Sequence, residues 1–217
     1  MYLFLLFGLP LGFLLLVLDQ YPRSEFAQTR GAFAKGVAAF IPTWLIARIL
    51  GSIVPARYGS FLICFHEWAD RLLPYAVLPA LAYLVFFKLG DRLPPGTEAR
   101  RLTAFYAGAL SPVGVCETAR AWGSPSPYTL FLLPFILAAI CLAMPKAMTR
   151  INQSYGFALA MRIVGVAAVT LLASLCPYFF LARLWPLSIL LIAVLGLWTG
   201  FLAYEELRRR AAIPFDE

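Results

Sequence analysis

The residues best suited to acid–base chemistry lie in the segment HEWADR, which holds the only histidine of the chain. On a helix, His66 and Asp70 are four residues apart, and so are Glu67 and Arg71, so each pair can touch. A histidine held beside carboxylates is a candidate general acid and base. The candidate catalytic residues of this hypothesis are His66, Glu67, Asp70 and, from a later helix, Glu117.

A metal or cofactor site has little support in the residues. HEWAD lacks the second histidine of the zinc-protease pattern HExxH, and the chain has no other histidine with which to complete a His-rich site. The four cysteines show no C-x-x-C spacing, and no phosphate-binding loop or dinucleotide fingerprint occurs. We therefore expect no bound metal and no cofactor, and a disulfide among Cys64, Cys116 and Cys176 stays open.

The alternative for HEWADR is structural. As a helix, the surrounding segment has an apolar face formed by Tyr58, Phe61, Leu62, Phe65, Trp68, Ala69 and Leu72. A polar stripe is formed by Ser60, Cys64, Glu67 and Arg71. This pattern predicts a short interfacial helix, anchored by Trp68, that leads into a membrane span.

The elements that position these residues follow from the composition, which is 62% hydrophobic and only 13% charged. A spanning helix needs about 20 mainly apolar residues. Seven segments come close to this length, namely residues 2–18, 37–54, 72–88, 102–119, 127–147, 157–178 and 184–204. Because lipid offers no partners for free backbone amides, the sequence predicts an all-α, polytopic membrane bundle that forms a single transmembrane domain, residues 1–217.

Charge in the connections predicts the orientation. With an external N-terminus and seven crossings, twelve basic residues lie inside: Arg23, Arg30, Lys35, Lys88, Arg92, Arg100, Arg101, Lys146, Arg150, Arg208, Arg209 and Arg210. Only four then lie outside: Arg57, Arg71, Arg120 and Arg183. The C-terminus is accordingly predicted to be cytoplasmic, and the interfacial helix before the third span to be external. A bacterial inner membrane is the expected location.

The fourth segment is the weakest, because it contains Pro112, Glu117 and Arg120. If it dipped into the membrane and returned, every later segment would invert, so the charge bias favours a full crossing. Arg48 lies toward the external end of its helix, where it either pairs with Glu117 or extends to the headgroups. Arg48, Arg71 and Arg120 are expected to form a polar outer cluster.

Small residues and prolines mark the helix contacts. Two Gly-x-x-x-Gly pairs, Gly8 with Gly12 and Gly196 with Gly200, allow close packing within the chain or against a partner subunit. A ladder of small residues is formed by Ala139, Ala143 and Ala147. Prolines fall inside the first five predicted spans, at Pro10, Pro42, Pro79, Pro112 and Pro134.

These patterns favour a protein without catalysis of its own, a membrane-embedded subunit of a transport or assembly system. Two alternatives remain open: an enzyme acting on a lipid or lipid-linked substrate at the outer leaflet, and a stand-alone carrier of small solutes. The expected partners are membrane lipids and other membrane subunits or further copies of the chain. The net charge of +7 does not require nucleic acid, since basic loops facing anionic lipid explain it.

Overall fold

The computed structural model describes residues 23–54, 61–87, 95–121, 133–152 and 156–211. Every regular element in these ranges is a helix, so the all-α fold class is confirmed for them. In chain order the elements are α2 (Arg23–Ile53), α3 (Leu62–Glu67), the π-helical turn η1 (Trp68–Leu72), α4 (Leu73–Phe86), α5 (Pro95–Ala121), α6 (Leu133–Asn152), α7 (Phe157–Leu181) and α8 (Trp185–Ala211). The predicted first span, residues 2–18, lies outside the described residues.

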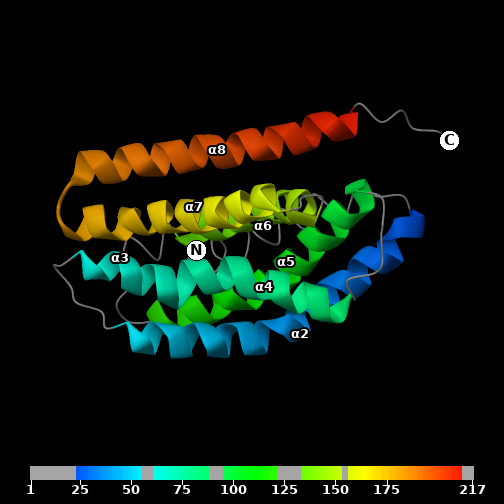
Figure 1. Ribbon diagram of the computed structural model, residues 1–217, viewed down its shortest axis with the longest axis horizontal. Coiled ribbons are helices and arrows are strands. Elements are labelled where there is room, and N and C mark those ends of the chain that lie inside the picture. Colours follow the sequence, from blue (N-terminus) through cyan, green and yellow to red (C-terminus); the bar gives the residue numbers. More distant parts are fainter. Residues whose placement is uncertain (1–22, 55–60, 88–94, 122–132, 153–155, 212–217) are drawn as a thin grey trace.

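The long helices lie side by side in an elongated bundle, and successive ones run in opposite directions, with α3, η1 and α4 forming one continuous helix (Figure 1). α2 and α5 pack together on one side, α7 and α8 lie on the other, and α6 contacts both α5 and α8. The core between them is aromatic and aliphatic, with Tyr75, Phe105, Tyr106 and Leu137 fully buried. The hydroxyl of Tyr106 donates a hydrogen bond to the carbonyl oxygen of Ala76, which ties α5 to α4.

Three helices are long and apolar enough to cross a membrane, namely Thr29–Ile53, Leu62–Phe86 and Ala160–Phe180. Shorter apolar helices cover Ala139–Thr149 and Trp185–Trp198. Large apolar side chains on the outside of the bundle, such as Ile41, Val85 and Leu197, are largely exposed. A surface of this kind is unfavourable in water and suited to lipid. The helices and their surface together indicate an integral membrane protein.

The expected interfacial helix is not a separate element, which corrects the prediction for this region. α3 begins at Leu62 and continues through η1 into α4, so the helical rod starts well before the predicted residue 72. Burial does not follow the two predicted faces: Phe61, Leu62 and Phe65 of the apolar face are exposed, whereas Leu72 of the same face is buried, and so is Cys64 of the polar stripe. The physical reason is that lipid accepts apolar side chains, while polar ones find partners only inside the bundle.

α2 and α5 cross at very close range. A Cβ on Gly36 of α2 would lie 2.1 Å from the carbonyl oxygen of Phe105, and a Cβ on Gly108 of α5 would lie 2.2 Å from that of Phe33. The contact is therefore reciprocal, with each glycine facing the backbone of the partner helix. Any larger residue would push the helices apart, so these two glycines fix how α2 and α5 meet.

α5 is one uninterrupted helix from Pro95 to Ala121. Its length is about 40 Å at 1.5 Å per residue, so it does not dip and return as the alternative for the fourth segment required. Pro112 lies inside it, as Pro42 lies inside α2 and Pro79 inside α4, in agreement with the sequence. Pro134 is instead the second residue of α6, and the proline inside that helix is Pro145.

α7 and α8 form a hairpin whose turn includes Arg183 in the left-handed region, with φ of 60°. The glycines of α8 are not used for close packing inside the described part of the chain. A Cβ on Gly196 or on Gly200 would meet no atom within 4 Å. Both positions therefore face open space. The other predicted glycine pair, Gly8 with Gly12, lies outside the described residues.

Candidate functional site

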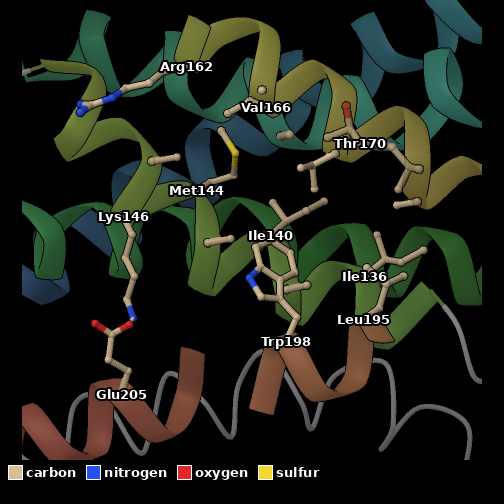
Figure 2. A pocket seen from close by; sticks show the side chains of 18 residues that line it. Ile136, Ile140, Met144, Lys146, Arg162, Val166, Thr170, Leu195, Trp198 and Glu205 are labelled. Atoms are coloured by element: carbon tan, nitrogen blue, oxygen red, sulfur yellow. Dashed lines mark hydrogen bonds and ion pairs between the residues drawn. The ribbon is translucent and has the colours of Figure 1, made fainter. Parts of the chain in front are cut away.

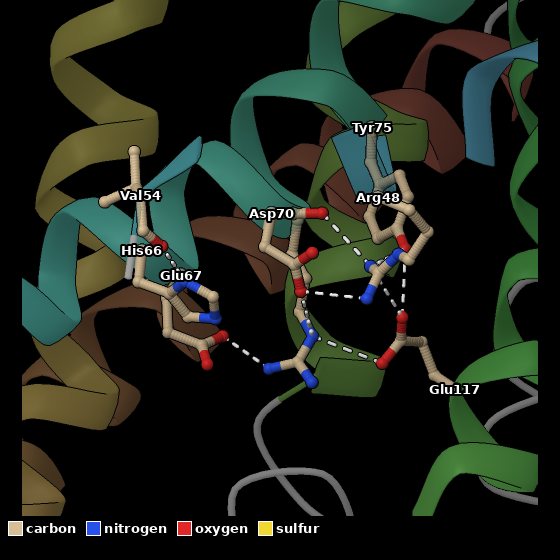
Figure 3. Close-up of polar contacts among 8 residues, drawn as sticks. Arg48, Val54, His66, Glu67, Asp70, Tyr75 and Glu117 are labelled. Atoms are coloured by element: carbon tan, nitrogen blue, oxygen red, sulfur yellow. Dashed lines mark hydrogen bonds and ion pairs between the residues drawn. The ribbon is translucent and has the colours of Figure 1, made fainter. Parts of the chain in front are cut away.

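Polar side chains from four consecutive helical elements and from α5 point toward one another between the helices (Figure 3). We call this group the Arg48 cluster. Its members are Arg48 from α2, Glu67 from α3, Asp70 and Arg71 from η1, Tyr75 from α4 and Glu117 from α5. The cluster brings together Glu67, Asp70 and Glu117 of the predicted catalytic set with two of the three arginines predicted for the outer polar cluster.

Arg48 is the centre of the cluster. Its Nη1 lies 3.0 Å from Oδ2 of Asp70, and its Nη2 lies 3.2 Å from Oε1 of Glu117. Nη2 also donates to the carbonyl oxygen of Asp70 and to the hydroxyl of Tyr75, both at 3.1 Å. Of the two alternatives for Arg48, the structure thus shows pairing with Glu117. One guanidinium ties α2 to η1, α4 and α5.

Arg71 makes the second set of ion pairs. Its guanidinium pairs with Glu67 one turn earlier on the same rod, as the spacing predicted. Its Nε lies 3.2 Å from Oε2 of Glu117 and 3.9 Å from Oδ2 of Asp70. Glu117 is therefore shared, with one carboxylate oxygen facing each arginine. Tyr75 completes the arrangement, since its hydroxyl donates to Oε1 of Glu117 at 3.0 Å.

Burial makes these contacts energetically important. The side chain of Glu117 is 0% exposed and that of Asp70 is 5% exposed. Ions removed from water lose their solvation, and only close partners of opposite charge compensate for that loss. Three carboxylates against two guanidiniums leave a formal charge of −1 on the cluster. Each carboxylate contacts at least one arginine, so the two guanidiniums compensate most of the buried negative charge.

Local geometry lets consecutive residues of one helix share the site. Asp70 and Arg71 lie in η1, whose π-helical turn is wider than an α-helical turn and is frequent at functional sites. Across from them, Gly51 of α2 leaves room for the carboxylate of Asp70: a Cβ there would lie 2.1 Å from Oδ1. Trp68, also in η1, donates from Nε1 to Oγ1 of Thr170 at 3.0 Å and so ties the turn to α7.

His66 lies apart from the ion pairs. Its Nδ1 is 2.6 Å from the carbonyl oxygen of Val54, and because a carbonyl only accepts, Nδ1 donates this hydrogen bond. The carboxylate of Asp70, its predicted partner, is turned toward Arg48 (Figure 3). The structure therefore does not show a histidine oriented by Asp70, which the acid–base hypothesis required. His66 instead joins α3 to Val54, the residue after the end of α2.

Three further predictions concern Arg120, a bound metal and a disulfide. The side chain of Arg120 lies outside what the structure describes. No group of three or more His, Cys, Asp or Glu side chains is placed to hold a metal ion, among the residues that were described. The cysteines considered for a disulfide, Cys64, Cys116 and Cys176, are free thiols.

Two contributors escaped the sequence reasoning, Tyr75 and Gly51. Tyr75 stands in an apolar run, where nothing in one sequence distinguishes a core tyrosine from a hydrogen-bonding one. A signal for Gly51 did exist. Small residues recur every three or four positions along α2, at Ala32, Gly36, Ala39, Thr43, Ala47 and Gly51, and all are buried. This spacing is the same small-residue signature that was assigned to the other glycine pairs.

Comparison with known proteins yields no relative: no protein-family model, no curated protein and no solved structure matches the chain. The Arg48 cluster is a network of ion pairs that joins α2, the α3–α4 rod and α5, although Nε of Arg48 is buried without a hydrogen-bond partner among the described residues. Its arrangement suits holding helices together in lipid, since every carboxylate is already engaged.

Proposed function

We propose that the protein is a non-catalytic, membrane-embedded subunit of a transport or assembly system in a bacterial inner membrane. The observation that carries this proposal is that every carboxylate of the Arg48 cluster is paired with an arginine. Its three carboxylates each face a guanidinium at salt-bridge distance, and His66 is engaged by Val54. The candidate catalytic residues thus make contacts that hold helices together.

The topology proposed with this function has seven crossings, with the N-terminus outside. The six described rods alternate in direction, as successive crossings do (Figure 1), and residues 2–18 would supply the seventh. Basic residues gather at the bundle end opposite the Arg48 cluster, at Arg30, Lys35, Arg100, Arg101, Lys146 and Arg162. By the positive-inside rule that end faces the cytoplasm, which sets the Arg48 cluster toward the outside.

The partner surface belongs to α8. Gly196 and Gly200 stand one turn apart with open space above them. A glycine inside a helix destabilises it by about 0.5–1 kcal/mol relative to alanine, and contact with lipid alone would not offset this loss of stability. Large exposed side chains, Leu197 and Phe201, flank the pair. Close approach of a second transmembrane helix explains both the small residues and the exposed apolar ones.

The test is purification at native expression level in mild detergent, with mass spectrometry of the proteins that remain bound. The wild-type protein should retain stoichiometric partner subunits. Gly196→Leu and Gly200→Leu should release them, because the added side chains block close approach. Ala38→Leu is the matched control, since Ala38 is a small exposed residue on α2, and it should retain the partners. A protein that purifies alone at native level would refute the subunit assignment.

The same preparation separates the alternatives. A lone protein whose activity on a lipid substrate is abolished by His66→Ala would favour the outer-leaflet enzyme. Solute uptake by vesicles that contain only this protein would favour the carrier. Under the subunit proposal, His66→Ala leaves the transport or assembly activity of the complex unchanged, because His66 contributes only one structural hydrogen bond.

A further inference from the structure

Basic residues at the basic end of the bundle differ in whether an acid faces them. A cavity of about 580 Å³ lies between α6, α7 and α8 (Figure 2). The ladder Ala139, Ala143 and Ala147 lines this cavity instead of a helix contact. Lys146 lines it too, and its Nζ lies 3.3 Å from Oε2 of Glu205. This lysine therefore has an acidic partner within the described chain.

Lys35 and Arg101 form a second basic group, and neither is paired with an acid among the residues that the structure describes. Both cations lie over the ring of Phe87, the residue after α4: Nζ of Lys35 is 4.2 Å from the ring centroid, and Cζ of Arg101 is 4.4 Å from it. Because both lie this close to one point, the two charges are within about 9 Å of each other. An aromatic ring attracts cations through its quadrupole but is itself neutral, so a formal charge of +2 remains.

The crossing of α2 with α5 holds the two side chains in place. Lys35 is next to Gly36, which faces the backbone of Phe105. Arg101 lies one turn before Phe105 on α5, and its Nε donates to the hydroxyl of Tyr83 at 2.7 Å. That bond uses one of the five guanidinium N–H groups. The Nη groups of Arg101 and the ammonium of Lys35 are therefore the donors that this site offers to a ligand.

Helix lengths place these two charges at a membrane surface. The α2 axis rises about 27 Å from Lys35 to Ile53, and the α5 axis rises about 30 Å from Arg101 to Ala121. The hydrocarbon core of a bilayer is about 30 Å thick. When the far ends of both helices lie at one boundary of this core, Lys35 and Arg101 lie at the other, next to the lipid headgroups. Lys35 is exposed, so its ammonium is accessible there.

We propose that Lys35 and Arg101 together bind the phosphate group of one anionic phospholipid, in the leaflet at the basic end of the bundle. A phosphate group has several acceptor oxygens and accepts from both cations, which also relieves the repulsion between the two like charges. The depth of the site favours a lipid phosphate over a phosphate ion dissolved in water. This inference rests on the membrane location of the protein, not on the Arg48 cluster or the partner surface on α8.

The first test measures headgroup recognition by native mass spectrometry of the full chain. The purified protein is exchanged into mixed micelles that contain phosphatidylglycerol or phosphatidylcholine with identical acyl chains, and retained lipid is counted. We expect one phosphatidylglycerol to be retained in preference to phosphatidylcholine, whose choline would add a third positive charge. Each basic group near a membrane surface contributes about fivefold in affinity, so Lys35→Gln should weaken phosphatidylglycerol retention about fivefold, and Lys35→Gln with Arg101→Gln about 25-fold.

The matched control removes two charges from the same end of the bundle. Arg30→Gln with Arg162→Gln changes exposed residues of α2 and α7, and it should leave phosphatidylglycerol retention unchanged. Melting curves show whether each variant is folded, and Lys35→Gln, which changes an exposed side chain, should melt like the wild-type protein.

The second test locates the lipid. A photoreactive diazirine on the glycerol headgroup of phosphatidylglycerol should cross-link to peptides that contain Lys35 or Arg101. Cross-links confined to other peptides would place the lipid elsewhere and overturn the proposal. Equal retention of the two lipids would remove the preference for an anionic headgroup. An equal loss in the control variant would leave only the overall charge, and displacement of the lipid by excess inorganic phosphate would assign the site to a soluble phosphate.

Discussion

Gly51 of α2 and Asp70 of η1 occupy complementary space: the Cβ that Gly51 lacks would lie 2.1 Å from Oδ1 of Asp70. This absence lets the Asp70 carboxylate lie in the helix interface and reach Arg48 at 3.0 Å. The two residues are far apart in sequence, and neither marks the site alone. The ion pair of Asp70 with Arg48 therefore depends on the space that Gly51 leaves on α2.

Gly51→Ala should consequently destabilise the protein, although alanine is ordinarily the better helix residue. The added methyl group displaces the Asp70 carboxylate, and overpacking of this kind costs about 1–3 kcal/mol. The free energy of unfolding can be followed by circular dichroism as the fraction of denaturing detergent rises. Gly165→Ala is the control and should be neutral or slightly stabilising, because its methyl group meets nothing. Equal stability of the two variants would contradict the packing argument.

Glu117 should be the most sensitive acid of the chain. Glu117→Gln keeps the shape of the side chain but removes its negative charge. The positive charges of Arg48 and Arg71, which both face Glu117, are then only partly compensated. Breaking a buried pair on one side costs about 3–5 kcal/mol. The same detergent unfolding measurement checks this value. A loss below about 1 kcal/mol would show that water reaches the cluster.

Arg48 and Glu117 should also be energetically coupled. In a double-mutant cycle with Arg48→Met and Glu117→Gln, the double variant should lose less stability than the sum of the two single losses. Coupling of about 0.5–3 kcal/mol is expected for residues in direct contact. Strict additivity would mean that the 3.2 Å pair contributes nothing to holding α2 against α5.

Adding a methyl group at either glycine where α2 crosses α5 should destabilise the protein. Gly36→Ala and Gly108→Ala each place a methyl group against a backbone carbonyl, so both helices must separate and the Arg48 cluster must stretch. We expect a loss of about 1–3 kcal/mol for each variant. Gly196→Ala, on a helix face with open space, should show none. Thermal stability in detergent distinguishes the two groups.

The orientation can be measured with an impermeant maleimide on intact spheroplasts. In a variant without the native cysteines, Leu184→Cys lies in the α7–α8 turn and should be labelled from outside. Gly156→Cys, just before α7 and at the other end of the bundle, should be labelled only after the membrane is opened. The reverse pattern would invert the topology, and labelling of both sites from one side would mean that α7 does not cross.

The sequence by itself determined that the described chain is helical and suited to a membrane. Long apolar segments leave the backbone no other way to satisfy its hydrogen bonds in lipid, so the helices at 157–181 and 185–211 begin within a residue of the predicted positions. Local spacing also predicted the contact of Glu67 with Arg71, because residues four apart on a helix are neighbours whatever surrounds them.

Only the tertiary structure decided which face of each helix is inside. In α3 the buried residues are Ile63 and Cys64, whereas Leu62 and Phe65 are exposed, and a single sequence does not state which apolar side of a helix is turned inward. The pairing of Arg48 with Glu117 spans 69 positions, and the choice between pairing and extension to headgroups depends on how α2 meets α5. That crossing is set by two glycines whose importance comes from what they face, not from their spacing. For the same reason the alanine ladder of α6 lines a cavity, since only the positions of α7 and α8 determine whether small residues meet a helix or leave space.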